Sequence, residues 1–414
     1  MNMKIEPKTL KGFRDFLPNE ARKRQFVISI LKEVFESYGF EPLETPVLEY
    51  EEILLGKYGD EGDKLMYRFT DNGDRKVAMR YDQTVPLARV AAQYSNDIPL
   101  PFKRYQVQNV FRAENTQKGR YREFLQVDCD TIGSDSPLAD AELIALAINS
   151  YKKLGFKKFK VLINDRKVFD NLIKENLVEQ NLLVKVLRAV DKLAKIGEEG
   201  VMEEFEKIGV EKNKGKQILD NLKNQSPIDN LAKLFSYLED LEVSKDYYEF
   251  SPTLARGLDY YTGTIFEIVC EEYPAGSLGG GGRYDSLIGL FSNSQIPAVG
   301  FAVGFDRTIE AMTELNLFPE IETTKALITV FSKELVSYSL NAATFLRDNN
   351  IPCEVYPNKN TSLDKQLKYA NKKQIPYVVI IGDDEIKNNK VKIKNMISGE
   401  QIEISPDKLP SAIK

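Results

Sequence analysis

The chain has 414 residues, of which 42% are hydrophobic and 29% are charged, and its formal net charge is −5. This composition is ordinary for a soluble globular protein, and the length predicts two or three domains. No 18 apolar residues run together, so neither membrane insertion nor export is expected. The chain contains no histidine, which excludes imidazole general bases, histidine-based triads and most zinc or iron sites.

The three cysteines, Cys129, Cys270 and Cys353, lie far apart in the sequence. Such spacing gives neither a disulfide framework nor a metal-binding pair, and it fits a reducing cytoplasm. Positive charge is concentrated in residues 325–414, which carry 14 Lys and Arg against 10 Asp and Glu. This excess permits a polyanionic partner, although charge alone is weak support for one.

The first part of the chain predicts a helix followed by short extended segments. Apolar residues between Glu20 and Tyr38 follow helical spacing, and Gly39 ends the helix. Residues 40–47 contain two prolines and are therefore expected at a sheet edge or an interface. Residues 76–81 predict a strand, and the next helix begins at Thr84, whose side chain is expected to cap it.

Residues 104–130 predict two strands joined by a polar loop. In the second strand apolar and polar residues alternate, so one face would meet a core and the other a polar site. If the two strands pair directly, Arg112, Gln126 and Asp130 can line one floor. The loop, residues 115–122, carries donors suited to phosphate, namely Lys118, Gly119, Arg120 and Arg122.

The hairpin permits two interpretations. The mixed charges and the basic loop suggest a nucleotide site. In the alternative, the hairpin is solvated and its loop arginines pair with Glu114 and Glu123. The hairpin alone leaves both open.

A helix over residues 137–154 and a strand over 158–163 are expected next. Residues 166–242 then predict one helix after another, which suggests a helical domain inserted between two strands of the sheet. One face of this segment is apolar, formed by Leu183, Val186, Leu187, Val190 and Leu193.

A turn rich in tyrosine precedes a strand predicted at residues 264–269. The turn contains Arg256, Gly257, Asp259, Tyr260 and Tyr261. It could supply a fixed cation and two hydroxyls without any histidine. Core tyrosines beside a surface arginine are the alternative.

Glycines mark the next segment, where Gly279–Gly282 would let the backbone approach a ligand closely. Residues 296–312 predict a strand that runs into a helix. Arg307 lies in the opening turn of that helix, where donors could converge on an anion. The alternative is a surface pair of Arg307 with Asp306 or Glu310.

The C-terminal part predicts a separate domain. Residues 316–324 form the linker, and strands alternate with helices from residue 325 onward. This alternation indicates a small α/β domain with a mainly parallel sheet.

Taken together, these segments resemble a known family. The helix and strand ending at Pro46, the FRAE hairpin, and the strand and helix containing FDR are similar to motifs 1, 2 and 3 of class II aminoacyl-tRNA synthetases. LARGLDYYTGTIFE (254–267) and GGGGRYDSL (279–287) resemble two signature blocks of the histidyl-tRNA synthetases. KGFRDFLP (11–18) and YDQT (81–84) also fit, and five ordered motifs over nearly the whole chain are far more specific than any one of them.

The resemblance implies an α+β fold with a class II synthetase catalytic domain at residues 1–320. That domain would contain a mainly antiparallel sheet flanked by helices, with a helical insertion at 166–245. A C-terminal α/β anticodon-binding domain would occupy residues 325–414.

The resemblance also implies a histidine pocket. Asp82, with Gln83 and Thr84, matches the segment that holds the ammonium, and Tyr260 with Tyr261 matches the pair that meets the imidazole. Such a site rejects other side chains because its buried polar groups would be left unpaired. The implied histidine-binding residues are Asp82, Gln83, Thr84, Arg112, Gln126, Asp130, Arg256, Tyr260 and Tyr261.

An ATP site is implied beside it, with Arg112 and Arg256 as the catalytic residues at the α-phosphate. The substrate carboxylate is already ionised when it attacks the α-phosphorus, so the first step needs no general base. Mg²⁺ is expected with ATP, and no side-chain metal ligands are expected. The implied ATP-binding residues are Arg112, Glu114, Arg120, Phe124 and Arg307.

The implied partners are tRNA(His), with its acceptor arm under the helical insertion, and a second copy of the chain across residues 20–47. A cytoplasmic location is expected. Two other functions are weighed against this one: a synthetase-like regulatory subunit of histidine biosynthesis that charges no tRNA, and a class II synthetase for proline, threonine or glycine. The three arginines Arg112, Arg256 and Arg307 disfavour the first, and the RGLDYY block disfavours the second.

Overall fold

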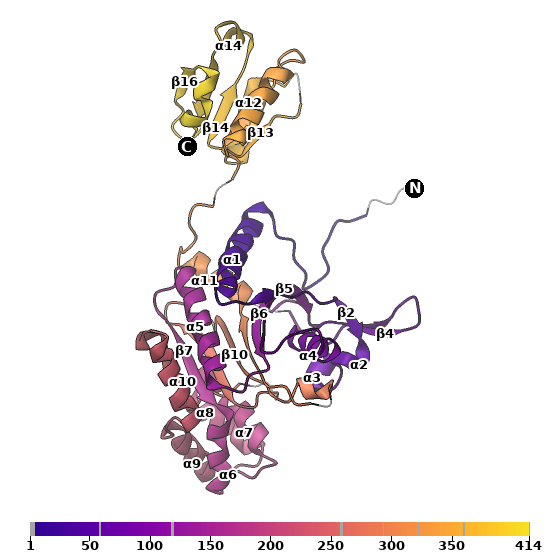
Figure 1. Cartoon of the computed structure of the whole chain (residues 1–414), viewed down its shortest axis with the longest axis vertical. Helices are drawn as coiled ribbons and strands as arrows, with labels where there is room; N and C mark the ends of the chain where they lie inside the picture. Colours follow the sequence, from indigo (N-terminus) through magenta and orange to yellow (C-terminus); the bar gives the residue numbers. More distant parts are fainter. Residues whose placement is uncertain are drawn as a thin grey trace. The chain divides into compact units, whose positions relative to one another are not determined.

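The computed structural model describes residues 5–57, 59–116, 120–256, 260–292, 294–321, 323–358 and 361–413 (Figure 1). The chain divides into two compact units, Met1–Phe318 and Pro319–Lys414. Among the described strands, the first unit has two sheets and the second has one.

An eight-stranded sheet is the centre of the first unit, in the order β1-β5-β6-β11-β10-β9-β7-β8. Among the described strands, the inner pairings are antiparallel and the outermost two, β1 with β5 and β7 with β8, are parallel. The strands are β1 (Glu41–Pro42), β5 (Phe102–Phe111), β6 (Glu123–Ile132), β7 (Phe159–Asp165), β8 (Tyr248–Phe250), β9 (Thr264–Cys270), β10 (Gly279–Arg283) and β11 (Ala298–Val303).

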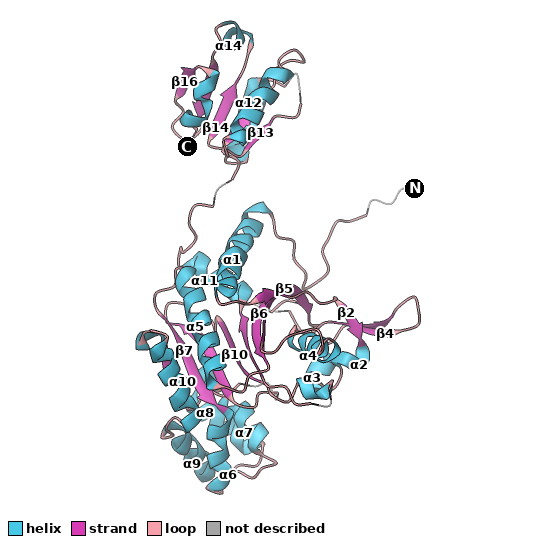
Figure 2. Ribbon diagram, in the orientation of Figure 1, coloured by secondary structure: helices cyan, strands magenta, loops and turns pink. Residues whose placement is uncertain are grey.

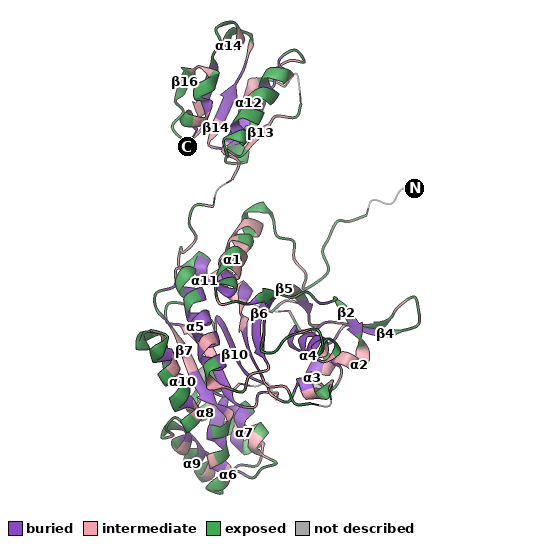
Figure 3. Cartoon of the chain, in the orientation of Figure 1, coloured by how far each residue is buried: buried purple, intermediate pink, exposed green. Residues whose placement is uncertain are grey.

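One face of this sheet is packed against helices (Figure 2). These helices are α1 (Pro18–Ser37), α5 (Pro137–Lys153), α10 (Asp229–Asp240) and α11 (Phe305–Glu314). Val127 and Cys129 of β6 belong to the core between sheet and helices, as the predicted alternation requires. The strands β6, β7, β9, β10 and β11 and the helix α5 are buried along most of their length (Figure 3). The predicted mainly antiparallel sheet flanked by helices is therefore confirmed.

A small three-stranded sheet, in the order β2-β4-β3, also lies in the first unit. It comprises β2 (Leu48–Tyr50), β3 (Arg68–Thr70) and β4 (Lys76–Met79), with α2 (Glu51–Leu54), α3 (Gly59–Lys64) and α4 (Thr84–Gln93) nearby in sequence. The predicted cap of α4 is wrong: the capping position is Gln83, and Thr84 is already helical. Instead Asp82 Oδ1 accepts a hydrogen bond from the backbone N–H of Val85 at 3.1 Å, because its carboxylate reaches the free first-turn donor.

The helical insertion leaves the sheet at the end of β7 and returns at the parallel neighbour β8. Its elements are η1 (Arg166–Phe169), α6 (Asp170–Lys174), α7 (Leu183–Val190), α8 (Leu193–Lys207), α9 (Lys212–Lys223), α10 and η2 (Lys245–Tyr247). The predicted apolar face lies in a core of its own, which also contains Leu254, Ala255 and Tyr261. The insertion therefore packs directly against the segment that carries Arg256.

The second unit has a five-stranded sheet in the order β13-β12-β14-β15-β16. Its first two pairings are parallel and the other two are antiparallel, so the expectation of a mainly parallel sheet was only half right. The connection between β14 and β15, residues 381–390, is too short for the crossover of a dozen or more residues that parallel neighbours need. The elements are β12 (Ala326–Ile328), α12 (Val336–Asp348), β13 (Cys353–Val355), α13 (Leu363–Lys372), β14 (Tyr377–Ile380), α14 (Asp383–Lys387), β15 (Val391–Asn395), β16 (Gln401–Ile404), η4 (Pro406–Lys408) and α15 (Leu409–Ala412).

Candidate functional site

Two neighbouring cavities in the first unit collect the predicted site residues. The first, of about 350 Å³, is lined by Asp82, Thr84, Arg112, Phe124, Gln126, Asp130, Arg256, Tyr260, Tyr261 and Arg307, together with the glycines of β10. The second, of about 260 Å³, shares Arg112, Phe124 and Arg307 and adds Glu114 and Arg120. Residues predicted from separate parts of the sequence are thus brought together around one continuous site.

Gln83 is the predicted site residue that lines neither cavity. Its side chain is buried, and its amide nitrogen donates to the backbone carbonyls of Gln108 and Gln126 at 2.9 and 3.0 Å. These bonds hold the start of α4 against β5 and β6. The structure therefore gives Gln83 a supporting position behind the pocket.

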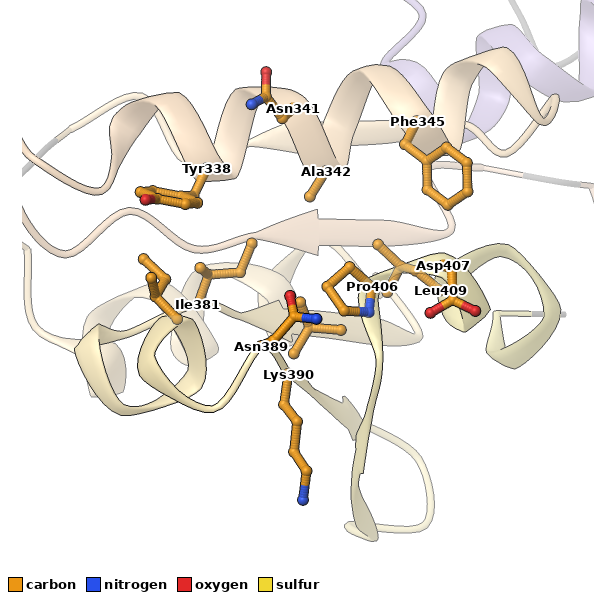
Figure 4. A pocket seen from close by; sticks show the side chains of 12 residues that line it. Tyr338, Asn341, Ala342, Phe345, Ile381, Asn389, Lys390, Pro406, Asp407 and Leu409 are labelled. Carbon is orange, nitrogen blue, oxygen red and sulfur yellow. The ribbon is translucent and has the colours of Figure 1, made fainter.

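A cavity of about 410 Å³ lies in the second unit, between α12 and the segments after β14 (Figure 4). Tyr338, Ala342 and Phe345 of α12 face Ile381 and Pro406 across it. Its walls are largely apolar, and none of the predicted site residues lines it. Its larger volume does not make it the better candidate, because catalysis on a charged substrate needs converging polar groups.

Asp130 lies on the floor of the first cavity between two partners. Its Oδ2 is 2.7 Å from the guanidinium of Arg104, opposite it in the β5–β6 register, and both side chains are buried. The hydroxyl of Tyr284 donates to its Oδ1. Burial raises the pKa of Asp130, and the positive charge of Arg104 opposes that rise. The carboxylate is thereby held in one orientation.

Gln126 and Asp128 form a second polar pair on the same strand. The amide nitrogen of Gln126 donates to Asp128 Oδ2 at 2.6 Å, which leaves the amide oxygen unused by this bond. Burial raises the pKa of Asp128 to about 8. Within the described ranges, Gln126 Oε1 and Asp128 Oδ1 are buried and have no hydrogen-bond partner. Such atoms call for a polar ligand or ordered water.

Arg256 approaches the sheet directly above β10. Its Nη1 lies 3.7 Å from Oε1 of Glu267, and its side chain is 21% exposed. Burial lowers the pKa of Arg256, but the neighbouring Tyr261, Glu267, Tyr260 and Asp191 together outweigh burial and raise it. A Cβ on Gly280 would lie 2.2 Å from Nη1 of Arg256, so this approach requires glycine. The arginine is therefore a fixed positive charge inside the cavity wall.

Tyr260 and Tyr261 stand side by side, with ring centroids 4.9 Å apart. Burial raises the pKa of both hydroxyls, so both stay protonated and can donate a hydrogen bond. The alternative of core tyrosines beside a surface arginine does not describe this arrangement, because Arg256 lies in the cavity wall. The predicted features at Gly257 and Asp259 lie outside the described residues.

Arg112 and Arg307 lie where the two cavities meet. Nε of Arg112 donates to the carbonyl of Tyr81 at 3.1 Å, and its guanidinium lies 5.1 Å from the ring centroid of Phe124. Arg307 donates to the carbonyl of Ser277 at 3.2 Å. Asp306, one of the two partners that the alternative gave to Arg307, has its two oxygens bound by Arg14 and Arg24.

The loop between β5 and β6 fits the alternative interpretation in part. Arg120 lies 3.5 Å from the carboxylate of Glu114, as expected if the hairpin is solvated and its loop arginines pair with nearby glutamates. Both residues nevertheless line the second cavity. Lys118 and Gly119 lie outside the described residues.

Sequence reasoning missed Arg104, Asp128 and Tyr284 as parts of the floor. Arg104 and Asp128 could have been found from the pairing of the two strands. Arg104 lies opposite Asp130, and Asp128 lies on the same face of its strand as Gln126 and Asp130. Tyr284 directly follows β10, and nothing local to its sequence pointed to a bond with Asp130.

In the part of the chain that the structure describes, no group of three or more His, Cys, Asp or Glu could hold a metal ion. No described helix is long and apolar enough to cross a bilayer.

Comparison with known proteins adds independent findings. Residues 12–308 match the family described as histidyl-tRNA synthetase, and residues 325–414 match the family described as anticodon binding domain. The histidine–tRNA ligase of Cytophaga hutchinsonii is 38% identical and covers 98% of each chain, and that of Christiangramia forsetii is 39% identical and covers 100% of each. The crystal structure of histidyl-tRNA synthetase from Nostoc sp. PCC 7120 superposes with a TM-score of 0.85 at 29% identity, covering 99% of this chain and 100% of that one.

Proposed function

This chain belongs to the histidyl-tRNA synthetase family, and on that basis we propose that its two cavities join histidine to the AMP part of ATP, with release of pyrophosphate, and pass the histidine to the 3′ end of tRNA(His). Membership of the family confirms the predicted enzyme class, an aminoacyl-tRNA synthetase. The observation that carries the proposed use of the site is the meeting of Arg112, Arg256 and Arg307 in one cavity.

In the first step Arg112 and Arg256 stabilise the charge that develops at the α-phosphate. The ionised carboxylate of histidine attacks the α-phosphorus, the bond to pyrophosphate breaks, and pyrophosphate leaves with the electron pair. Fixed cations in a partly dry site act strongly on this charge because they need no reorganisation during the reaction. Arg307, near the start of α11, would hold the outer phosphates, and Phe124 would stack on the adenine.

The floor of the first cavity suits histidine. Gln126 Oε1 offers a buried acceptor, the hydroxyls of Tyr260 and Tyr261 offer donors, and Asp128 Oδ1 is a further buried polar atom without a partner among the described residues. Asp130, held by Arg104, presents a carboxylate in a set position. An amino acid without both donors and acceptors on its side chain would leave these groups unpaired, at a cost of about 1 to 3 kcal/mol for each.

Mg²⁺ would enter with ATP and neutralise the outer phosphates. Phosphate oxygens and water molecules would supply ligands to the ion. On the protein side Arg112, Arg256 and Arg307 would share the remaining negative charge.

A homodimer and a cytoplasmic location complete the proposal. The second copy would lie across residues 20–47. The neighbouring Leu48, Tyr50 and Phe69, which are 42%, 54% and 48% exposed and share one face of the small sheet, would be covered with them. Sedimentation of the full chain at twice its monomer mass is the expected result. The three cysteines are free thiols, which suits the cytoplasm.

One experiment separates the proposal from its alternatives. ATP–pyrophosphate exchange is measured with each of histidine, proline, threonine and glycine, followed by charging of tRNA(His). Histidine alone is expected to drive exchange. Exchange driven by another amino acid would assign a different synthetase, and binding of histidine without exchange would favour a regulatory subunit.

A further inference from the structure

We propose that the N-terminal segment, residues 12–16, is a clamp that positions the ATP site, with Arg14 as its central positioning residue. The clamp rests on the proposed function of the site. It would hold the loop between β5 and β6 against the first turn of α11, so that Arg112 and Arg307 face the same nucleotide.

The first link of the clamp runs through the backbone. The carbonyl of Gly12 accepts a hydrogen bond from the N–H of Arg122 at 2.9 Å, and the carbonyl of Arg122 accepts one from the N–H of Arg112 at 2.9 Å. Gly12 has a φ of +90°, and a Cβ there would lie 2.7 Å from Cγ of Arg122. Arg112 is thus linked to the N-terminal segment through two successive backbone hydrogen bonds.

The second link runs through side chains. Arg14 donates to Oδ2 of Asp306 at 2.6 Å, and its guanidinium lies 3.2 Å from the ring centroid of Tyr121. Tyr121 belongs to the loop and Asp306 to α11, and both line the second cavity, whereas Arg14 does not. Arg14 therefore joins two walls of the ATP site from behind.

Asp306 is held from a second side as well. Arg24 of α1 donates to its Oδ1 at 2.5 Å, and the guanidinium of Arg24 lies 4.7 Å from the ring centroid of Phe305. Asp306 immediately precedes Arg307, so fixing Asp306 fixes the opening turn of α11. Carboxylates are favourable in that turn because free backbone N–H groups point outward there.

Opening the clamp is expected to weaken the binding of ATP more than that of histidine. When the clamp is opened, the ATP cavity loses its geometry while the histidine floor on β6 and β10 keeps its own contacts. The Michaelis constant for ATP should therefore rise much more than that for histidine. A merely structural role would lower folding stability and move both constants together.

The test uses the full chain and four variants: Arg14→Gln, Tyr121→Leu, Tyr121→Phe and the double variant Arg14→Gln with Tyr121→Leu. Arg14→Gln and Tyr121→Leu are expected to raise KM for ATP about tenfold, the effect of losing one partly buried charged contact. Tyr121→Phe keeps the ring and should lose less than Tyr121→Leu. The double variant should be little worse than Arg14→Gln alone, because Arg14→Gln already removes the contact with Tyr121.

Arg75→Gln is the matched control, since it also removes an arginine–aspartate pair, with Asp71 at 2.7 Å, but on an exposed turn. ATP binding measured by calorimetry without histidine keeps the clamp testable even if histidine-driven exchange fails. Equal rises in both Michaelis constants, additive losses in the double variant, or unchanged ATP affinity in Arg14→Gln would each overturn the clamp. If Arg14→Gln does not fold, the order of the two Tyr121 variants decides.

Discussion

Asp128 and Asp130 lie two residues apart on the floor of the pocket and meet different partners. Asp130 is paired with Arg104, whereas Asp128 accepts a hydrogen bond from Gln126. Burial is the largest influence on both, and it raises the pKa of Asp128 to about 8. At neutral pH, Asp128 is therefore expected to keep its proton and to act as both donor and acceptor.

Replacing Asp128 tests this protonation, because a raised pKa makes the free energy of unfolding depend on pH. In the unfolded chain the Asp128 carboxyl has the ordinary pKa of about 3.8, but in the folded protein its pKa is about 8. Between these pH values only the unfolded state loses the proton, so stability falls as pH rises, by at most about 1.4 kcal/mol per pH unit. Asp128→Asn should remove this fall, and calorimetric melting of the first unit at pH 5 and pH 8 measures it.

Asp135→Asn, at an exposed position, controls for the loss of one carboxylate. Melting curves of Asp128→Asn that run parallel to those of the parent at both pH values would contradict a raised pKa. The infrared absorption of a protonated carboxyl at neutral pH, absent from Asp128→Asn, gives a direct check.

Arg256 provides the second prediction at this scale. Arg256→Ala removes a fixed cation beside the proposed α-phosphate, so adenylate formation should fall about 10²- to 10³-fold, or ~3 kcal/mol. Binding of histidine and ATP should persist, because other residues hold both substrates. Pyrophosphate exchange and equilibrium binding are measured on the same preparation, with the exposed Arg68→Ala as a control. Near-normal exchange in Arg256→Ala would refute the role.

Among the elements, β10 shows how backbone shape sets the site. Its glycines lie in the middle of the eight-stranded sheet, between β11 and β9. A Cβ at Gly281 would lie 1.9 Å from the carbonyl oxygen of Gly300, and one at Gly280 would meet Arg256. The absence of side chains at these positions therefore allows the close packing of strands and the approach of the arginine.

Gly280→Ala tests this element. The added methyl would lie 2.2 Å from Arg256 Nη1 and 2.7 Å from the backbone oxygen of Phe266, so one of them must move. Overpacking of this kind costs roughly 1 to 3 kcal/mol of stability, and displaced Arg256 should lower pyrophosphate exchange as well. Gly73→Ala is the control, because its nearest neighbour is the flexible side chain of Arg75 at 3.3 Å. If Gly280→Ala catalyses pyrophosphate exchange at the rate of the parent, the close approach of Arg256 to β10 is unimportant for activity.

For the whole molecule, the two units have separate hydrophobic cores. The core of the main sheet involves residues of the first unit, and the core around Ile328, Val379 and Ile393 belongs to the second. The proposed adenylate site lies entirely in the first unit. This separation implies that activation and tRNA recognition can be divided between two pieces of chain.

A chain ending at Phe318 tests that division. It should keep histidine-dependent pyrophosphate exchange, because it retains both cavities and their supporting core. Charging of tRNA(His) should fall strongly, since the basic second unit is absent. A folded fragment that still charges tRNA at the parental rate would contradict an anticodon-binding role for residues 325–414.

The sequence alone determined much of this protein because its signals are local. Helical spacing in residues 20–38, alternation in β6 and the glycines of β10 each reflect which side of one element is buried. The resemblance of the ordered motifs then identified the family and named the three arginines that share the cavity.

Only the tertiary structure decided which residues meet across distance. The pairing of Arg104 with Asp130, the bond from Tyr284, the supporting position of Gln83 and the contact of Arg14 with Tyr121 and Asp306 depend on strand register and on segments far apart in the chain. No local pattern carries that information, because the free energy of these contacts exists only once the sheet has brought the segments together.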